Sequence, residues 1–132
     1  MITSTKEPVA AERQVKRILY VDDMRELREV ARLALSRSGH KVDCATDGGE
    51  AFELVQANPG AYDIVISDHH MGVMNGVELV MKLREIKYAG AIAIVSSELN
   101  REVAEDYHRL GVDKILYKPV ELAHLRAIVL EA

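Results

Sequence analysis

The sequence has one cysteine, Cys44, among its 132 residues, so no disulfide can form within the chain. Its 17 Lys and Arg residues are outnumbered by 21 Asp and Glu residues, and no stretch is basic enough to predict direct binding of nucleic acid. No uninterrupted apolar segment is long enough to span a bilayer, and the first residues lack the apolar core of a signal peptide. These absences predict a cytoplasmic protein without a membrane segment.

The composition is that of one ordinary globular domain. Hydrophobic residues make up 48% of the chain and charged residues 29%, which provides enough apolar surface for a single core. Residues 1–15 are mostly polar, include Pro8 and show no periodic pattern, so we predict a flexible lead-in there. The folded domain is expected to occupy residues 16–132.

Short apolar, β-branched runs alternate with segments of helical spacing along the rest of the chain. The runs cover residues 18–21, 41–45, 62–67, 91–95 and 112–116. Gly39 and Gly111 follow two of the predicted helices, where a left-handed residue often ends a helix. Asn58-Pro59-Gly60 ends another predicted helix. Five strand–helix repeats predict an α/β fold, a doubly wound five-stranded parallel sheet with helices on both faces.

Most of the predicted strands are followed by a polar side chain that can do chemistry. These side chains are Asp22 and Asp23 after the first strand, Asp68 after the third, Ser96 after the fourth and Lys118 after the fifth. The carboxyl ends of parallel strands meet at one edge of the sheet, where open α/β sheets bind their ligands. Charged groups gathered in one crevice are costly unless they perform a function. The sequence therefore predicts a functional site at this edge.

The residue types at this edge suit the transfer of a phosphoryl group. Asp22 and Asp23 would repel each other, and Mg²⁺, which prefers oxygen ligands, would relieve the repulsion; the alternative is a helix cap, because Asp is favoured before a helix. An ionised Asp68 can attack phosphorus, and Lys118 and Ser96 can supply a positive charge and a hydroxyl donor. Phosphoryl transfer needs mainly positioning and charge neutralisation, which this set provides.

Four separately spaced motifs resemble the receiver domain of two-component response regulators, with the CheY-like fold. They are Val21-Asp22-Asp23, the segment Asp68-His-His-Met-Gly-Val-Met-Asn-Gly76, Ser96-Ser97 and Lys118-Pro119. The resemblance covers nearly all of residues 16–132 and implies strand order 2-1-3-4-5. It also implies that a histidine kinase or phosphotransfer protein phosphorylates the chain. An output protein or domain, which the sequence does not identify, would then bind according to the phosphorylation state.

The same resemblance assigns roles to individual residues. It implies that Asp68 is the phosphoacceptor and that Asp22, Asp23, Asp68 and the backbone carbonyl of His70 bind Mg²⁺. Ser96 matches the family's switch hydroxyl, and Lys118 matches a lysine that is usually followed by a cis proline, here Pro119. Partners would bind the fourth helix, fifth strand and fifth helix, about residues 99–130.

Several positions depart from the family pattern or border its site. Gly72 replaces a usual proline, and Ile115 replaces an aromatic residue whose rotation reports phosphorylation, so any switch must depend more on the Ser96 loop and the fourth helix. We predict that His70 sets the lifetime of the phosphoryl group and that Glu98 borders it. The His69-His70 pair also suggests Zn²⁺, but the sequence offers no third ligand.

The expected function is that of a switch that promotes only its own phosphorylation and dephosphorylation and is not a conventional enzyme. Two other functions are alternatives to it. A pseudo-receiver would be a constitutive interaction module that no longer uses the pocket; Gly72 and Ile115 favour it, and the intact acidic and basic residues argue against it. An aspartyl phosphatase would place an Asp-x-Asp pattern on the first strand, which Asp22-Asp23-Met24 is not. The sequence leaves a phosphorylation-dependent homodimer open, and Tyr107 is expected to be part of an apolar stripe on the fourth helix.

Overall fold

The computed structural model describes residues 15–132, which form one parallel sheet with helices on both faces. In chain order the elements are β1 (Arg17–Val21), α2 (Arg25–Arg37), β2 (Lys41–Ala45), α3 (Gly48–Ala57), β3 (Ile64–Asp68), α4 (Gly76–Glu85), β4 (Ala91–Ser96), α5 (Arg101–Arg109), β5 (Lys114–Tyr117) and α6 (Leu122–Glu131). The strand order is β2-β1-β3-β4-β5, and all four pairings are parallel. The predicted fold class and strand order are confirmed. The predicted lead-in, except for Val15, lies outside the described residues.

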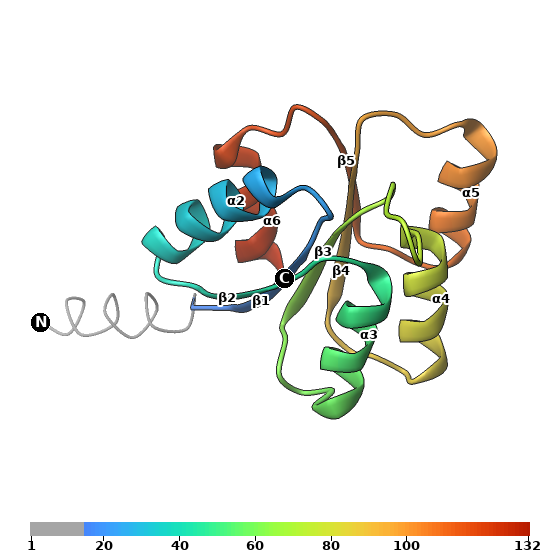
Figure 1. The fold of residues 1–132 in the computed structure, drawn as a ribbon, viewed down its shortest axis with the longest axis horizontal. Coiled ribbons are helices and arrows are strands. Elements are labelled where there is room, and N and C mark those ends of the chain that lie inside the picture. Colours follow the sequence, from blue (N-terminus) through green and yellow to red (C-terminus); the bar gives the residue numbers. More distant parts are fainter. Residues whose placement is uncertain (1–14) are drawn as a thin grey trace, which may run out of the picture.

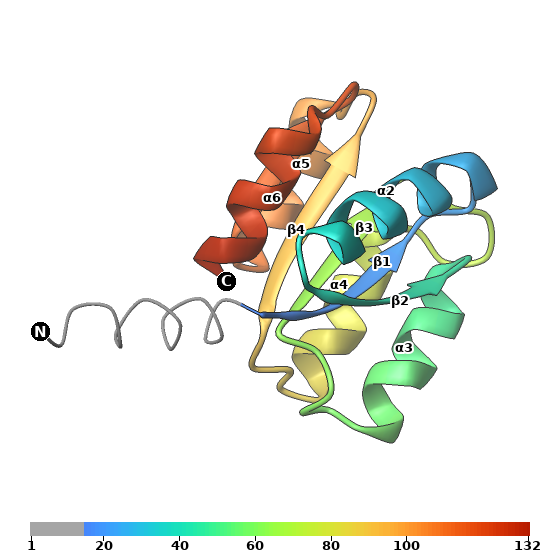
Figure 2. The same cartoon turned by 90° about the vertical axis from the view of Figure 1, so that its left-hand side faces the viewer.

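Helices α2 and α6 lie on one face of the sheet, and α3, α4 and α5 lie on the other (Figures 1 and 2). Alternate residues of the central strands enter the two cores. In β1, Ile18 packs towards α2 and α6, whereas Leu19 packs towards the opposite helices. In β3, Ile66 and Val65 divide in the same way. A strand that buries both faces must be apolar throughout, which explains the continuous apolar runs of the sequence.

Both predicted glycine helix ends are confirmed. Gly39 and Gly111 have φ angles of 95° and 74°, in the left-handed region where glycine carries no steric penalty. The residue after each glycine closes the helix, because Val112 N–H donates to Tyr107 O at 3.3 Å and His40 N–H donates to Leu35 O at 3.2 Å.

Two predicted strands begin too early in the sequence-based assignment. The run at 112–116 becomes β5 only from Lys114, because Val112 belongs to the turn that closes α5. The run at 62–67 becomes β3 from Ile64 and extends to Asp68. The side chain of Tyr62 donates from Oη to Asp43 Oδ2 at 2.7 Å, so Tyr62 joins the loop to β2 instead of extending the strand.

Candidate functional site

The carboxyl ends of β1, β3, β4 and β5 bring the predicted polar residues to one edge of the sheet. Asp22 directly follows β1, Asp68 ends β3, Ser96 ends β4 and Lys118 directly follows β5. The register aligns these ends, because Val21 pairs with Ser67, Asp68 with Val95, and Ser96 with Tyr117. Residues that are up to 96 positions apart in the sequence thus lie around one crevice, as the sequence predicted.

Three carboxylates form the floor of the crevice. Asp22, Asp23 and Asp68 each place an oxygen within 4.8 Å of the others, and they are the single group of three or more potential metal-ligating side chains that residues 15–132 contain. Asp22 and Asp68 are 1% and 5% exposed, whereas Asp23 is exposed. Asp22 also has the alternative role considered for it, because its Oδ1 accepts a hydrogen bond of 2.9 Å from the Met24 N–H just before α2.

Lys118 supplies the positive charge of the crevice. Its Nζ lies 3.3 Å from Asp68 Oδ1 and 3.6 Å from Asp22 Oδ2. Even so, these two carboxylate oxygens are buried and receive no hydrogen bond from the described residues. Buried polar atoms without a partner are rare in folded proteins. Two such oxygens, converging with a third carboxylate, fit a hard cation such as Mg²⁺.

The same surroundings raise the pKa of Asp68 above the usual value of an aspartate. Burial is the largest cause, and the negative charge of Asp22 adds to it, while Lys118 acts in the opposite direction. The surroundings of this carboxylate therefore disfavour its charged form. A cation or a partner that supplies positive charge would stabilise it.

Ser96 points into its own loop. It is buried, and its Oγ donates to Glu98 O at 2.8 Å. The exposed His70 places Nε2 3.3 Å from the same carbonyl oxygen. The Lys118 N–H donates to Ser96 O at 2.8 Å, and the Lys118–Pro119 peptide bond is cis. The loop between β4 and α5 is thus connected to the crevice through the side chain of His70 and through the backbone of Lys118.

The rings of His69 and His70 meet edge to face with centroids 4.8 Å apart, but their hydrogen-bond partners differ, which the sequence did not indicate. His69 is 8% exposed and faces α5, where Tyr107 is fully buried; His69 Nδ1 and Tyr107 Oη form a hydrogen bond of 2.6 Å. The prediction that Tyr107 is an apolar packing residue was therefore incomplete, because its hydroxyl has a specific partner. Neither histidine side chain belongs to the group of side chains that could bind a metal ion together. A buried histidine near a tyrosine on another element has no signature in the sequence alone.

Ile115 and Gly72, the two other departures from the family pattern, make no specific polar side-chain contact within residues 15–132. Ile115 is partly buried and packs against the core under α3, α4 and α5. Gly72 is exposed, and a Cβ atom added there would meet nothing within 4 Å. Glycine is therefore not required by space at that position.

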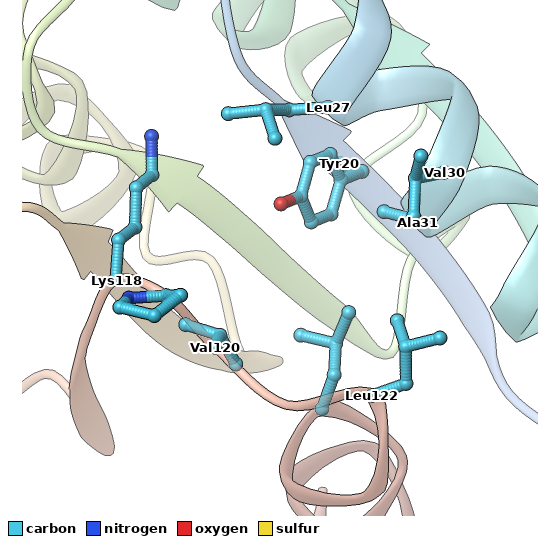
Figure 3. A pocket seen from close by; sticks show the side chains of 9 residues that line it. Tyr20, Leu27, Val30, Ala31, Lys118, Val120 and Leu122 are labelled. Carbon is cyan, nitrogen blue, oxygen red and sulfur yellow. The ribbon is translucent and has the colours of Figure 1, made fainter.

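An apolar cavity of about 370 Å³ lies beside the crevice, between α2 and α6. Lys118 forms one wall and Tyr20 and Leu27 the opposite one, as Figure 3 shows. At its rim, Val30 is 54% exposed and Leu122 is 37% exposed. The sequence analysis did not predict this cavity, because its walls come from β1, α2, the turn after β5 and α6.

Comparison with known proteins agrees with this fold and site. The profile of the response regulator receiver domain matches residues 18–130. Two-component response regulator 24 of Arabidopsis thaliana is 31% identical over 111 residues, which are 84% of this chain and 79% of that protein. The crystal structure of a response regulator receiver protein from Pseudomonas putida has a TM-score of 0.83 at 30% identity, covering 89% of this chain and 98% of the other.

A longer relative contains a similar segment. The sensor histidine kinase AruS of Pseudomonas aeruginosa is 30% identical over 123 residues, which are 90% of this chain and only 12% of the kinase.

A parallel sheet of order 2-1-3-4-5 with an acidic crevice at its carboxyl edge defines the CheY-like class of signalling domains. The chain belongs to the response regulator receiver domain family of two-component systems. Among the described residues, no helix combines the length and the apolar character that crossing a membrane requires.

Proposed function

We propose that this chain is a phosphorylation switch in which Asp68 accepts a phosphoryl group from a histidine kinase or a phosphotransfer protein in the cytoplasm. The observation that carries the proposal is the crevice of three carboxylates and Lys118, in which two buried oxygens have no hydrogen-bond partner within residues 15–132. Burying such charges lowers the stability of the fold. Accepting a phosphoryl group requires both the negative carboxylates and the positive charge of Lys118.

In the proposed reaction a carboxylate oxygen of Asp68 forms a bond to the phosphorus of a phosphohistidine in the donor. The bond from phosphorus to the imidazole nitrogen breaks, and its electron pair stays with the ring, which leaves as neutral histidine when its other nitrogen carries a proton. The product on Asp68 is an acyl phosphate. Lys118, already 3.3 Å from Asp68, would neutralise charge on the phosphoryl oxygens.

Mg²⁺ would be held by the carboxylates of Asp22, Asp23 and Asp68, together with the backbone carbonyl of His70. When bound, it supplies positive charge beside the phosphoryl oxygens and removes the repulsion among the carboxylates. The chain's own part is to hold these groups at fixed positions on the rigid ends of buried strands. The domain would thereby promote its own phosphorylation and hydrolysis and no other reaction.

The switch would operate by a shift of population. After phosphorylation, Ser96 would exchange its hydrogen bond to Glu98 O for one to the phosphoryl group, and the loop before α5 would move. The face formed by α5, β5 and α6 would then change its affinity for an output protein or domain. The change would also act on a homodimer that uses this face.

The apolar cavity between α2 and α6 offers a place for the phosphodonor. Its exposed rim residues Val30 and Leu122 line the same cavity as Lys118, so an apolar side chain of the donor that enters it would bring the phosphohistidine towards the crevice. This surface includes α2, which the α5–β5–α6 face does not, but the two surfaces share α6.

The alternative of a pseudo-receiver is not supported. A module that no longer used the crevice would gain stability by losing its buried carboxylates, yet Asp22 and Asp68 remain buried and Lys118 remains beside them. Comparable arguments disfavour the phosphatase, because Asp68 ends β3 and not the first strand.

Incubation with acetyl phosphate and Mg²⁺ tests the proposal, and beryllofluoride with Mg²⁺ serves as a mimic of the phosphoryl group. We expect mass spectrometry to find one phosphoryl group on Asp68, and none in Asp68→Asn. Phosphotransfer from a panel of kinases from the same source would identify the donor. Sedimentation before and after modification would test the homodimer. No label on wild-type protein under any of these conditions would overturn the proposed function.

A further inference from the structure

His69, the residue after Asp68, joins three elements through its backbone. Its N–H donates to Val95 O at 3.1 Å, directly before Ser96 at the end of β4. Its carbonyl accepts a hydrogen bond of 3.0 Å from the N–H of Gly76, the first residue of α4. A displacement of the backbone at Asp68 is therefore transmitted to both neighbouring elements.

The side chain of His69 adds a fourth connection, to α5. The 2.6 Å hydrogen bond from Nδ1 to Tyr107 Oη is enclosed, because His69 is 8% exposed and Tyr107 is fully buried. The rings meet edge to face, with centroids 5.6 Å apart. A buried polar pair of this kind is held firmly, because breaking it leaves two groups without partners in a medium of low dielectric constant.

The surrounding backbone is shaped to accommodate the tyrosine hydroxyl. A Cβ atom on Gly76 would lie 2.1 Å from Tyr107 Oη, so only glycine fits at the start of α4 while the hydroxyl is in place. The backbone around His69, the start of α4 and the middle of α5 thus meet at one oxygen atom.

Helix α5 has little buried surface of its own, and Arg84 of α4 holds its C-terminal end through hydrogen bonds of 2.8 Å to Leu110 O and Gly111 O. The helix spans Arg101–Arg109, and Tyr107 is its single buried residue. Its apolar neighbours Leu99, Val103 and Leu110 are only partly buried. Short helices with little buried surface lie at the low-stability end of a structure and respond most to small perturbations.

The site therefore contacts α5 at two places. The loop before the helix is held by Ser96 Oγ and His70 Nε2, which both contact Glu98 O. The helix itself is held by His69 through Tyr107. Ile115, in contrast, has no polar group with which to report a change at Asp68.

We propose that the His69–Tyr107 hydrogen bond holds α5 in its unmodified position and sets how strongly α5 responds to phosphorylation of Asp68. The inference rests on the proposed function. Once Ser96 turned to the phosphoryl group, this bond would still tie the middle of α5 to the segment after Asp68, while Arg84 holds the C-terminal end of the helix. Burial and, after it, the charge of Asp68 raise the pKa of Tyr107, so the hydroxyl keeps its proton and remains available for this hydrogen bond.

The test compares wild-type protein with Tyr107→Phe by hydrogen exchange of the α5 amides, with and without beryllofluoride and Mg²⁺. In wild-type protein we expect beryllofluoride to change the exchange of α5 by about fivefold or more. In Tyr107→Phe, the unmodified protein is expected to exchange at nearly the rate of modified wild type, and beryllofluoride to change it by less than about twofold. Fluorine NMR of bound beryllofluoride measures whether the crevice still binds.

Tyr88→Phe is the matched control. Tyr88 is also buried, and its Oη donates to Tyr62 O at 3.1 Å, away from the crevice. This variant loses a buried hydroxyl and its hydrogen bond, but its α5 response should remain that of wild type. If only Tyr107→Phe loses the response, general destabilisation is not the cause.

The outcomes separate the two proposals. A wild-type protein that does not bind beryllofluoride overturns the proposed function. Binding in both proteins with an equal change in α5 overturns the role of the hydrogen bond. If Tyr107→Phe does not fold, the double variant His69→Leu/Tyr107→Phe removes both polar partners and leaves neither unsatisfied. An α5 response of wild-type size in that variant would equally overturn the inference.

Discussion

Replacing Asp68 by asparagine should make the protein more stable in the absence of divalent cations. The substitution preserves the shape of the side chain and removes one negative charge from a residue that is 5% exposed. The raised pKa of Asp68, caused first by burial and then by Asp22, gives the direction, because a charge that the fold disfavours lowers the free energy of unfolding.

The magnitude follows from the distances in the crevice. With an effective dielectric constant of about 20, Lys118 at 3.3 Å attracts the Asp68 charge by about 5 kcal/mol. Asp22, with an oxygen no farther than 4.8 Å, repels it by about 3.5 kcal/mol or more. The remaining attraction of about 1.5 kcal/mol is smaller than the several kcal/mol that burying an ion costs. We therefore expect Asp68→Asn to gain about 1–2 kcal/mol.

Urea unfolding in EDTA, and again with Mg²⁺, measures this difference. In EDTA the midpoint of Asp68→Asn should lie roughly 0.5–1 M urea above that of wild type. Mg²⁺ at ten times its dissociation constant should stabilise wild type by about 1.4 kcal/mol and the variant less, because asparagine is uncharged. Asp106→Asn, at a partly exposed carboxylate on α5 outside the crevice, is the control and should respond to Mg²⁺ as wild type does.

The same experiment has a definite pH dependence. Because the pKa of Asp68 is raised in the folded protein, the unfolded chain ionises first, near the ordinary aspartate pKa of about 3.9. Wild-type stability is then lost as pH rises from that value through the folded pKa. The advantage of Asp68→Asn should be smallest below about pH 4 and should grow as pH rises through the folded pKa of Asp68. An Asp68→Asn variant that is less stable than wild type in EDTA at neutral pH would refute the reasoning, and an equal effect of Mg²⁺ on both would exclude Asp68 as a ligand.

Three further predictions address individual residues. His70→Ala should shorten the phosphoryl lifetime on Asp68 about two- to tenfold, measured by loss of label with His124→Ala as control; an unchanged rate would remove the role of His70. Val30→Asp, at the exposed rim of the apolar cavity, should slow transfer from a donor protein about fivefold or more but leave acetyl phosphate labelling unchanged, and equal effects on both would contradict a docking role. Gly76→Ala should cost about 1–3 kcal/mol in urea unfolding and less in a Tyr107→Phe background; strictly additive effects would show that the hydroxyl is not the obstacle.

The fold could be predicted because its determinants are local. The β-branched runs, the helical spacing and the two glycine helix ends each depend on a few adjacent residues, and all point to the same alternation. The boundaries that were wrong depend on contacts between distant segments. Tyr62 leaves the predicted strand because Asp43, on another strand, accepts its hydroxyl. No local pattern records that partner.

The residues of the site can likewise be divided into those that local sequence predicts and those that depend on distant contacts. Its acidic and basic residues could be predicted to meet, because each follows a strand and parallel strands end at one edge. The contact between His69 and Tyr107 could not, because it depends on how far α5 lies from the loop after β3. The apolar cavity likewise depends on the distance between α2 and α6. The order of strands along the sequence predicts which residues meet at the carboxyl edge of the sheet. The packing of the helices decides which cavities and contacts lie beside that edge.

The packing of the sheet also explains why a change at Asp68 would act on one side of the molecule. All five residues of β3 are buried, so the phosphoacceptor stands at the end of a fully buried strand, whereas no residue of the edge strand β5 is fully buried. The other edge strand, β2, is also largely uncovered, but it meets the crevice through a backbone hydrogen bond from Asp22 N–H to Ala45 O, which is part of the sheet. Towards β5 and α5 the connections are side-chain groups, Ser96 Oγ and Lys118 Nζ, which can exchange one partner for another. A new anion at Asp68 can therefore redirect bonds on the β5 side without breaking the sheet, and the face formed by α5, β5 and α6 is the one expected to respond.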